Sequence, residues 1–398
     1  MRLLLFTGKG GVGKTTLAAA SAARLAALGG KVLVVSTDPA HSLGDALGVP
    51  VGDGVAELDD GLSAAHIETR SLVDGAWAGL REHLRTLLSG AGLDEFDAEE
   101  LTVLPGVEEI LALTEVARLA ASGPWDTVVV DCAPTAETLR LVALPEALAG
   151  YLERLFPAHR RAVRGLLGGL AGGGLERWDS LGRELGALAD RLAELRELLL
   201  DQERTSVRLV LTPERVVAAE TRRTLTALAL QGVRVDGVVV NRLVPDVGDE
   251  TGTAADWLRR RRAEQEAVLT EVRESTDVPV RVVPHVADEP VGLPRLGELA
   301  LALYGADDPL AGAPPTRLIS VWREDDEGDY LLRLAVPLAA EAALDLARVG
   351  DELVVTVDGR RRLVDLPSVL RRCQVVSASA GPGGLTVRFR PDPRLWMR

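Results

Sequence analysis

Short apolar runs alternate with longer amphipathic segments over the first three quarters of this 398-residue chain. Runs rich in Val and Leu are typical of strands buried on both faces of a parallel sheet. We expect such strands at 2–6, 31–36, 126–131, 206–211, 237–241 and 280–283. Segments rich in helix formers lie between them, at 17–26, 214–230, 255–274 and 296–304. This alternation predicts an α/β fold with a mostly parallel central sheet and helices on both faces.

Two longer segments, at about 71–119 and about 144–203, interrupt the alternation and have mainly helical patterns. In the second segment, large apolar residues recur at spacings of three and four, at Trp178, Leu181, Leu185, Leu188, Leu192, Leu195 and Leu199. Packing against a neighbouring helix accounts for this seam. The alternative is that it forms one wall of an apolar groove for a client. We therefore expect a helical insertion subdomain.

The pattern changes again after residue 305. Residues 306–317 are rich in Ala, Asp, Gly and Pro, which is typical of a linker. Beyond it, apolar residues alternate with polar ones at Leu332, Leu334 and Val336, at Leu353, Val355 and Val357, and at Leu385, Val387 and Phe389. Asp358-Gly359 is a hairpin signal. The sequence thus predicts a domain at 1–305 and a small β-sandwich at 318–398.

Composition narrows the class of protein. A net charge of −14 argues against nonspecific binding to nucleic acid, which depends on basic side chains. Two cysteines cannot form a disulfide framework or a four-cysteine zinc site within one chain. The chain contains no uncharged apolar stretch of the roughly 20 residues that a transmembrane helix needs. We expect a cytoplasmic protein with no nucleic-acid partner and no transmembrane segment.

The loop at 8–16 indicates the class of ligand that the protein binds. Residues 8–16 read GKGGVGKTT and fit the phosphate-loop pattern G-x-x-x-x-G-K-[ST], between an apolar run and a helical pattern. Backbone N–H groups and the helix N-terminus would face the phosphates of ATP. The predicted binding residues are Gly8, Lys9, Gly10, Gly11, Val12, Gly13, Lys14, Thr15 and Thr16.

Individual roles in this loop follow from its chemistry. We expect Lys14 to contact the β- and γ-phosphates, the Thr15 hydroxyl to bind Mg²⁺, and Thr16 to reach the α-phosphate. The whole chain has three lysines, and two of them, Lys9 and Lys14, lie in this loop. Because arginine supplies the positive charge almost everywhere else, the loop chemistry is expected to require an ammonium group.

Polar residues follow other predicted strands. Asp131 ends one strand and could hold a magnesium-bound water, whereas Asp38 follows another strand and could orient or deprotonate the attacking water. A helix cap or a turn is the alternative role for each. Asn241 ends a third strand. Ligands of such sheets bind beyond the carboxyl ends of the strands, where all three residues are expected. His41 could sense phosphate or make a structural hydrogen bond.

These motifs together resemble those of the ArsA and tail-anchored-protein-targeting ATPases. The resemblance covers about 1–304 and rests on GKGGVGKTT at 8–16, STDPAHS at 36–42 and DCAPT at 131–135. It implies that Lys9 reaches across a homodimer to the nucleotide of the partner. It also implies that Asp38 acts on the attacking water in switch I, that 131–138 form switch II, and that Asn241 and Pro284 line the adenine.

The C-terminal region resembles an α-crystallin (small heat-shock) domain, through YLLRL at 330–334, LVDLP at 363–367 and AGPGGL at 380–385. Together the resemblances imply a homodimeric, Mg²⁺-dependent ATPase that handles hydrophobic protein segments, with Asp38, Lys9 and Lys14 as catalytic residues. One alternative is the energising ATPase of an arsenite or anion efflux pump, although Cys132 and Cys373 do not form an evident metalloid site. A nucleotide-stabilised holdase chaperone is the other.

Overall fold

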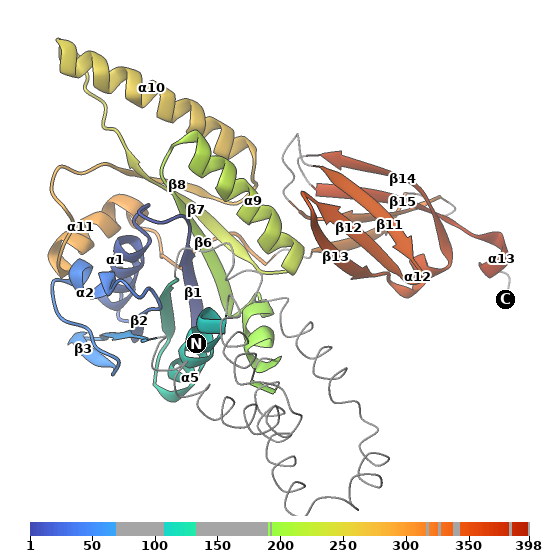
Figure 1. Cartoon of the computed structure of the whole chain (residues 1–398), viewed down its shortest axis with the longest axis horizontal. Helices are drawn as coiled ribbons and strands as arrows, with labels where there is room; N and C mark the ends of the chain where they lie inside the picture. Colours follow the sequence, from blue (N-terminus) through green and yellow to red (C-terminus); the bar gives the residue numbers. More distant parts are fainter. Residues whose placement is uncertain are drawn as a thin grey trace, which may run out of the picture. The chain divides into compact units, whose positions relative to one another are not determined.

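The computed structural model describes residues 1–68, 107–132, 190–191, 193–315, 318–324, 328–336, 343–381 and 384–396. Eight strands form a sheet in the order β3-β4-β2-β5-β1-β6-β7-β8 (Figure 1). Their bounds are β1 (Arg2–Thr7), β2 (Val32–Ser36), β3 (Ala56–Asp59), β4 (Leu62–His66), β5 (Thr127–Asp131), β6 (Thr205–Leu211), β7 (Val235–Leu243) and β8 (Val280–Pro284). Strand β3 runs antiparallel to β4, whereas β2 is parallel to β4 and β5, and β7 is parallel to β6 and β8. The predicted mostly parallel sheet is confirmed.

Helices separate most of these strands along the chain. They are α1 (Lys14–Ala27), α2 (Ser42–Leu47), α5 (Val107–Ser122), α9 (Arg215–Gln231), α10 (Thr253–Glu274) and α11 (Leu293–Tyr304). Helices α9 and α10 lie side by side and both contact β7 (Figure 1). Every strand and helix expected in this region is present within a few residues of its predicted bounds. Elements α2, β3 and β4 were not predicted, and the sequence of β4, LSAAH, explains why, because it has no β-branched residue although all of it is buried.

The described residues form two compact units. The first comprises Met1–Leu5, Thr15–Thr205 and Val291–Gly297, and the second comprises Phe6–Lys14, Ser206–Pro290 and Glu298–Arg398. Every residue of β2 and β5, which lie in the first unit, is buried, and so is every residue of β6, which lies in the second unit from Ser206 onward. The Val- and Leu-rich runs are therefore core strands, as their composition predicts.

Most of the predicted helical insertions falls outside the described residues. This applies to 71–106 and 144–189, including Trp178, Leu181, Leu185 and Leu188, and also to Leu192. Helix α5 covers the end of the first segment. In the second, residues 193–200 are helical, and Leu195 and Leu199 of the predicted seam are both buried.

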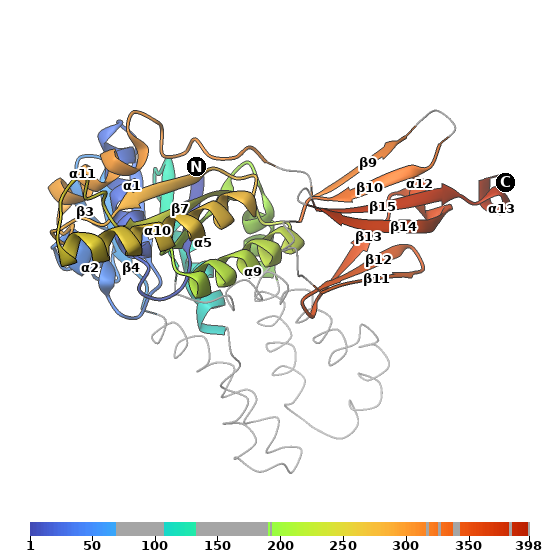
Figure 2. The same ribbon diagram turned by 90° about the horizontal axis from the view of Figure 1, so that it is seen from above.

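The C-terminal region is a separate antiparallel β-sandwich. One sheet has the order β14-β15-β10-β9 and the other β11-β12-β13, and Figure 2 shows β11–β13 as a layer of their own. The bounds are β9 (Ile319–Arg323), β10 (Tyr330–Leu334), β11 (Leu344–Val349), β12 (Glu352–Val357), β13 (Arg360–Asp365), β14 (Cys373–Gly381) and β15 (Gly384–Pro391), with short helices α12 (Ser368–Arg371) and α13 (Pro393–Trp396). All nine apolar residues that alternate in the sequence are buried in its core. Asp358 and Gly359 have φ of 49° and 77° and form the predicted β12–β13 hairpin turn.

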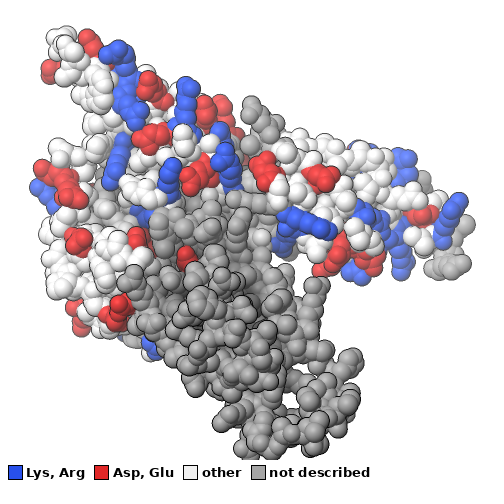
Figure 3. All heavy atoms as spheres, in the orientation of Figure 1, with Lys and Arg blue, Asp and Glu red and all other residues white. Residues whose placement is uncertain are grey.

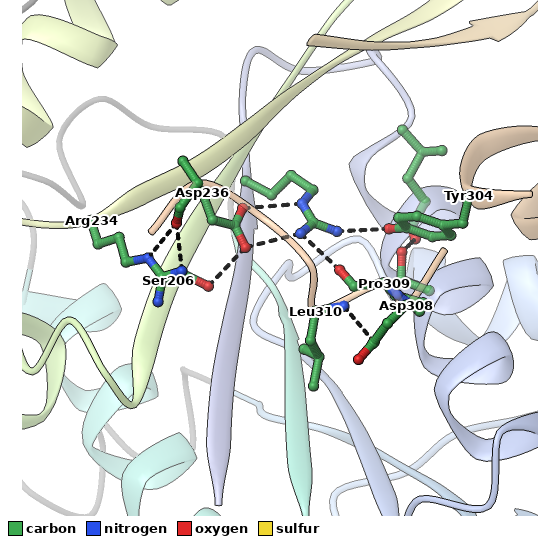
Figure 4. A network of polar contacts seen from close by, with 11 residues as sticks. Ser206, Arg234, Asp236, Tyr304, Asp308, Pro309 and Leu310 are labelled. Atoms are coloured by element: carbon green, nitrogen blue, oxygen red, sulfur yellow. Dashed lines mark hydrogen bonds and ion pairs between the residues drawn. The ribbon is translucent and has the colours of Figure 1, made fainter. Parts of the chain in front are cut away.

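A network of hydrogen bonds around a buried ion pair holds part of the predicted linker against β6 and β7 (Figure 4). Arg208 on β6 lies 2.9 Å from Asp236 on β7, and both side chains are almost wholly buried. The Arg208 guanidinium also donates to the Tyr304 hydroxyl (2.8 Å) and to the Pro309 carbonyl (2.9 Å). The Ala313 N–H donates to the Asp236 carbonyl at 2.8 Å. Residues 309–313 are therefore tied to β6 and β7, while the domain limits drawn from the sequence stay predictions.

Three of the four arginines at 259–262 on α10 are paired with acidic side chains. Arg259 lies 3.1 Å from Asp256, and Arg262 lies 2.8 Å from Glu266. On the face shown in Figure 3, basic and acidic side chains are interspersed over the described elements. The run of four arginines at 259–262 is thus not an open basic patch. Within the described parts of the chain, no helix has the length and apolar character needed to cross a membrane.

Candidate functional site

The phosphate loop connects β1 to α1, and its geometry explains two of its fixed glycines. Gly8 and Gly13 have φ of 155° and 94°, where side chains other than hydrogen are disfavoured. A Cβ at Gly8 would lie 2.1 Å from the Val210 carbonyl oxygen, and one at Gly13 would lie 2.4 Å from Asn241 Nδ2. By contrast, among the described residues no heavy atom within 4 Å would meet a Cβ at Gly10 or at Gly11. The loop is therefore packed on one side and open over Gly10 and Gly11.

The two loop lysines are held differently. Lys14 is buried, and its Nζ donates to the Lys9 carbonyl across the loop at 3.3 Å. The Lys9 side chain instead extends from the loop, where its Nζ lies 3.5 Å from Glu220 on α9. Lys14 is thus placed against the loop itself, and its contact with phosphate stays a prediction, whereas Lys9 is placed at the surface.

A pocket of about 470 Å³ lies beside the loop in the second unit. This volume is within the range of small-molecule sites. Its walls are formed by the loop, the ends of β6, β7 and β8, and helices α9 and α10. The lining residues are Lys9, Gly10, Gly11, Val12, Thr212, Glu214, Val217, Arg242, Val244, Trp257, Arg261, Gln265 and His285. Pro284 pairs with Leu243 and directly precedes His285, so the predicted base-lining residues Asn241 and Pro284 lie on neighbouring strand ends.

Asn241 is bound to the phosphate loop. Its Nδ2 donates to the Val12 carbonyl at 2.8 Å, and its Oδ1 accepts the N–H of Arg242 at 2.9 Å. The side chain is almost wholly buried. The structure therefore shows Asn241 supporting the loop, and its contact with adenine stays a prediction.

Hydroxyl groups surround the buried carboxylate of Asp131 in the first unit. Its Oδ2 accepts from Thr15 Oγ1 at 2.7 Å and from Ser36 Oγ at 3.0 Å. The Ser42 hydroxyl lies 3.1 Å from that of Thr15. Ser36 and Asp131 are register partners at the ends of β2 and β5. Hydroxyl and carboxylate oxygens are the donors that Mg²⁺ prefers, so Thr15 and Asp131 fit the predicted metal role.

Asp38 lies in the loop that follows β2. Its N–H donates to Ser36 Oγ at 3.2 Å, and its carboxylate accepts the N–H of Ala40 at 3.1 Å. The preceding residue, Thr37, donates its N–H to the Asp131 carbonyl at 3.0 Å. The structure thus brings Asp38 and Asp131 to the same strand edge, as the sequence predicts. The carboxylate also makes the turn contact that was its alternative role.

His41 stacks on a second histidine. Its ring centroid lies 4.0 Å from that of His66, the last residue of β4. Burial, followed by the neighbouring His41, lowers the pKa of His66. His41 therefore makes a structural ring contact in this loop, and phosphate sensing stays a prediction.

Other predicted residues keep the status of predictions. Thr16 lies half-buried in the first turn of α1. Residues 133–138 of the expected switch II fall outside the described residues, whereas the adjacent Cys132 is buried. Sequence reasoning assigned no role to Ser36, Ser42, Glu220 or Arg242. Ser36 could have been recognised because it ends a predicted strand, as Asp131 does.

Comparisons with known proteins identify the families that the two parts of the chain match. A family model described as "Anion-transporting ATPase" matches residues 1–305, and one described as "HSP20-like domain found in ArsA" matches residues 327–389. "Protein Rv2184c" of Mycobacterium tuberculosis is 43% identical over 99% of this chain and 97% of its own length. A "Putative arsenical pump-driving ATPase" of Chlorobaculum tepidum is 33% identical over 92% of this chain and 90% of its own length. "ATPase get3" of Aspergillus terreus is 30% identical over 69% of this chain and 82% of its own length.

The phosphate loop and the residues around Asp131 lie within the part of the chain that the ATPase model matches, and the β-sandwich contains the match to the HSP20-like model. Both resemblances drawn from the sequence motifs are thereby confirmed. The chain belongs to the ArsA ATPase family and carries the HSP20-like domain associated with it.

Proposed function

We propose that this protein is a homodimeric, Mg²⁺-dependent ATPase that uses ATP binding and hydrolysis to handle apolar protein segments. The hydrogen bond of 2.7 Å between Thr15 and Asp131 carries the Mg²⁺ assignment. It joins the hydroxyl that directly follows Lys14 to a buried carboxylate at a strand end. Such a pair of oxygen donors beside a phosphate loop suits a magnesium-bound triphosphate.

The remaining residues have separate roles in the transfer of the phosphoryl group to water. The loop N–H groups and the Lys14 ammonium bind and orient the triphosphate. Asp38, which is half-buried at the same strand edge as Asp131, orients the attacking water and accepts its proton. Bound Mg²⁺ supplies neutralisation of the negative charge on the phosphates.

Lys9 acts on the nucleotide of a second copy in this proposal. Its side chain is 44% exposed, and its acidic partner Glu220 is 41% exposed. Exposed ion pairs contribute about 1 kcal/mol or less, so a triphosphate can displace Glu220. Support also comes from the scarcity of lysine in the chain and from the motif resemblance.

Apolar segments are the favoured client because of two features of the chain. The first is the seam at 178–199, whose repeated large apolar residues suit one wall of an apolar groove, although its described members Leu195 and Leu199 are themselves buried. The HSP20-like domain is the second feature. The printed names of several relatives, "Putative arsenical pump-driving ATPase", favour a second candidate, the energising subunit of an anion pump. The cytoplasmic location expected from the sequence stays a prediction.

Hydrolysis by the wild type and by Asp38→Asn tests the enzymatic part. We expect kcat to fall by about 10²-fold or more, as for loss of a general base, while the Kd for MgATP is retained. Asp45→Asn is the matched control, since Asp45 is an exposed acid on α2 beside the same loop. Wild-type protein that neither binds nor hydrolyses MgATP would refute the proposal.

Two further measurements test the assembly and the client. Sedimentation of Asp38→Asn with MgATP should show a dimer, and apolar peptides should copurify with it. Stimulation of hydrolysis by arsenite, without such peptides, would instead support the pump subunit.

A further inference from the structure

Strand β7 is irregular where it meets the phosphate loop. Its register with β8 shifts between Val240 and Leu243, so Asn241 and Arg242 occupy a bulge. Arg242 has φ of 60°, which is uncommon for a residue with a side chain. Its N–H is held by Asn241 Oδ1 at 2.9 Å. Bulges beside active sites commonly redirect a side chain, and backbone outliers cluster at such sites.

The bulge directs two successive side chains onto two successive carbonyls of the loop. Asn241 Nδ2 donates to the Val12 carbonyl at 2.8 Å. Arg242 Nη1 donates to the Gly11 carbonyl at 3.0 Å. The same loop is open over Gly11, where no heavy atom in the described part of the chain lies within 4 Å of the position of a Cβ. One side of the loop is therefore held by β7 while another is free for a ligand.

The planar peptide bond converts these contacts into an orientation of N–H groups. In a trans peptide the C=O and the following N–H point in opposite directions. When Arg242 holds the Gly11 carbonyl, the N–H of Val12 must point away from Arg242. When Asn241 holds the Val12 carbonyl, the N–H of Gly13 is turned away from Asn241 in the same manner. Successive N–H groups turned to one side of a loop form an anion-binding nest.

We propose that Arg242 and Asn241 are positioning residues that orient the N–H groups of Val12 and Gly13 toward the triphosphate. This inference rests on the proposed function, because it needs nucleotide bound at the loop. Both residues act through the loop backbone, whether or not Asn241 also contacts the adenine base. Removal of either side chain should therefore weaken the binding of any polyphosphate ligand, whether or not the ligand carries a base.

The test uses the full-length protein. Its substitutions distinguish the effect of losing the Arg242 side chain from the effect of straining the backbone. Arg242→Gly accepts the positive φ without strain, so its effect reports loss of the guanidinium alone. Arg242→Lys restores one donor without the planar fork. Arg260→Ala is the matched control, since Arg260 is an exposed arginine on α10 that does not line the pocket.

Binding is measured by displacement of a fluorescent ATP analogue with MgATP and, separately, with magnesium tripolyphosphate, which has no base. We expect Arg242→Gly to raise the Kd of both ligands by a similar factor of about tenfold, as for loss of a hydrogen bond from a charged group. Arg242→Lys should recover part of this loss. The control should bind both ligands as the wild type does, and kcat at saturating MgATP should change much less than KM.

Several outcomes overturn the inference. Wild-type affinity in Arg242→Gly would show that the guanidinium does not position the loop. A loss for MgATP without a loss for tripolyphosphate, in Arg242→Gly or in Asn241→Ala, would show a base contact instead. Thermal unfolding identifies a variant that fails to fold, and because Asn241 is buried, the exposed Arg242 then decides the test. Failure of the unsubstituted protein to bind either ligand would refute the proposed function itself.

Discussion

The Lys9 ammonium lies 3.5 Å from the Glu220 carboxylate, which places the exposed loop lysine against α9 of its own chain. An ion pair at this exposure is weak and exchangeable. In the proposed dimer, Lys9 must leave Glu220 before it can contact the nucleotide of the second copy. Glu220 therefore competes with the triphosphate for the same ammonium group.

Neutralising this acid should favour the nucleotide-bound dimer. We predict that Glu220→Gln lowers the MgATP concentration at half-maximal dimerisation by about two- to fivefold, the equivalent of an exposed ion pair. Sedimentation across an MgATP titration measures this midpoint. Glu271→Gln is the control, because Glu271 pairs with Arg222 at 3.6 Å and does not contact the loop. An unchanged or higher midpoint in Glu220→Gln would contradict the prediction.

Asp131→Asn should uncouple nucleotide binding from Mg²⁺. The buried carboxylate accepts hydroxyl hydrogens from both Thr15 and Ser36, and the amide removes its negative charge. We predict a loss of about 10²-fold in kcat, as for removal of one group that stabilises a transition state electrostatically. ATP affinity should also depend less on Mg²⁺.

Ser36→Ala is a milder variant of the same site, with which Asp131→Asn can be compared. It removes one donor to Asp131 but leaves the carboxylate and its 2.7 Å contact with Thr15. Its effect on kcat and on Mg²⁺ dependence should be smaller than that of Asp131→Asn. Steady-state hydrolysis at several Mg²⁺ concentrations compares the two, and equal effects would place the metal role elsewhere.

Folding stability should fall in mild acid because of His66. Burial and the adjacent His41 lower its pKa from the ordinary value of 6.5, against the opposing charges of Asp53, Asp38 and Glu68. Between pH 6.5 and the lower pKa of the folded state, the unfolded chain binds more protons than the folded chain. The free energy of unfolding must therefore decrease as the pH falls below 6.5.

Urea unfolding between pH 5 and pH 8, a range that spans the histidine titration, measures this dependence. His66→Gln, which cannot titrate, should have a shallower decrease in mild acid than the wild type. His285→Gln is the control because His285 is exposed. A slope unchanged in His66→Gln would assign the acid sensitivity to other groups.

Breaking the Arg208–Asp236 pair should destabilise the protein strongly. The pair is almost wholly buried, so Asp236→Ala leaves a guanidinium without its charged partner. We predict a loss of about 3–5 kcal/mol in the free energy of unfolding. The double variant Arg208→Met/Asp236→Leu should recover much of it, because it removes both charges. Asp307→Ala, which breaks the more exposed 2.9 Å pair with Arg281, should cost about 1 kcal/mol or less.

The phosphate loop was predictable because the backbone conformations of Gly8, Gly11 and Gly13 and the charge of Lys14 are local requirements. The sandwich core was predictable for a related reason, since alternation at β10, β12 and β15 places apolar residues on one face of each strand. In both cases the information lies within a few consecutive residues.

Contacts between distant segments could not be predicted in this way. Arg242 reaches Gly11 only because β7 carries a bulge, and no local pattern distinguishes Arg242 from other arginines after strands. The role of Ser42 depends on a loop that returns to Thr15. Strand β4 is buried by its neighbours in the sheet and not by a strong preference of LSAAH for strands.

The contacts around Ser36 have a mechanical consequence. The Ser36 hydroxyl is hydrogen-bonded both to the carboxylate of Asp131 and to the N–H of Asp38, and the Thr37 N–H joins the Asp131 carbonyl. A displacement of the Asp131 backbone must therefore strain or break these links and move the start of the Asp38 loop. Asp131, assigned to the metal, and Asp38, assigned to the attacking water, are therefore mechanically coupled. Release of the cleaved phosphate would then displace both residues together.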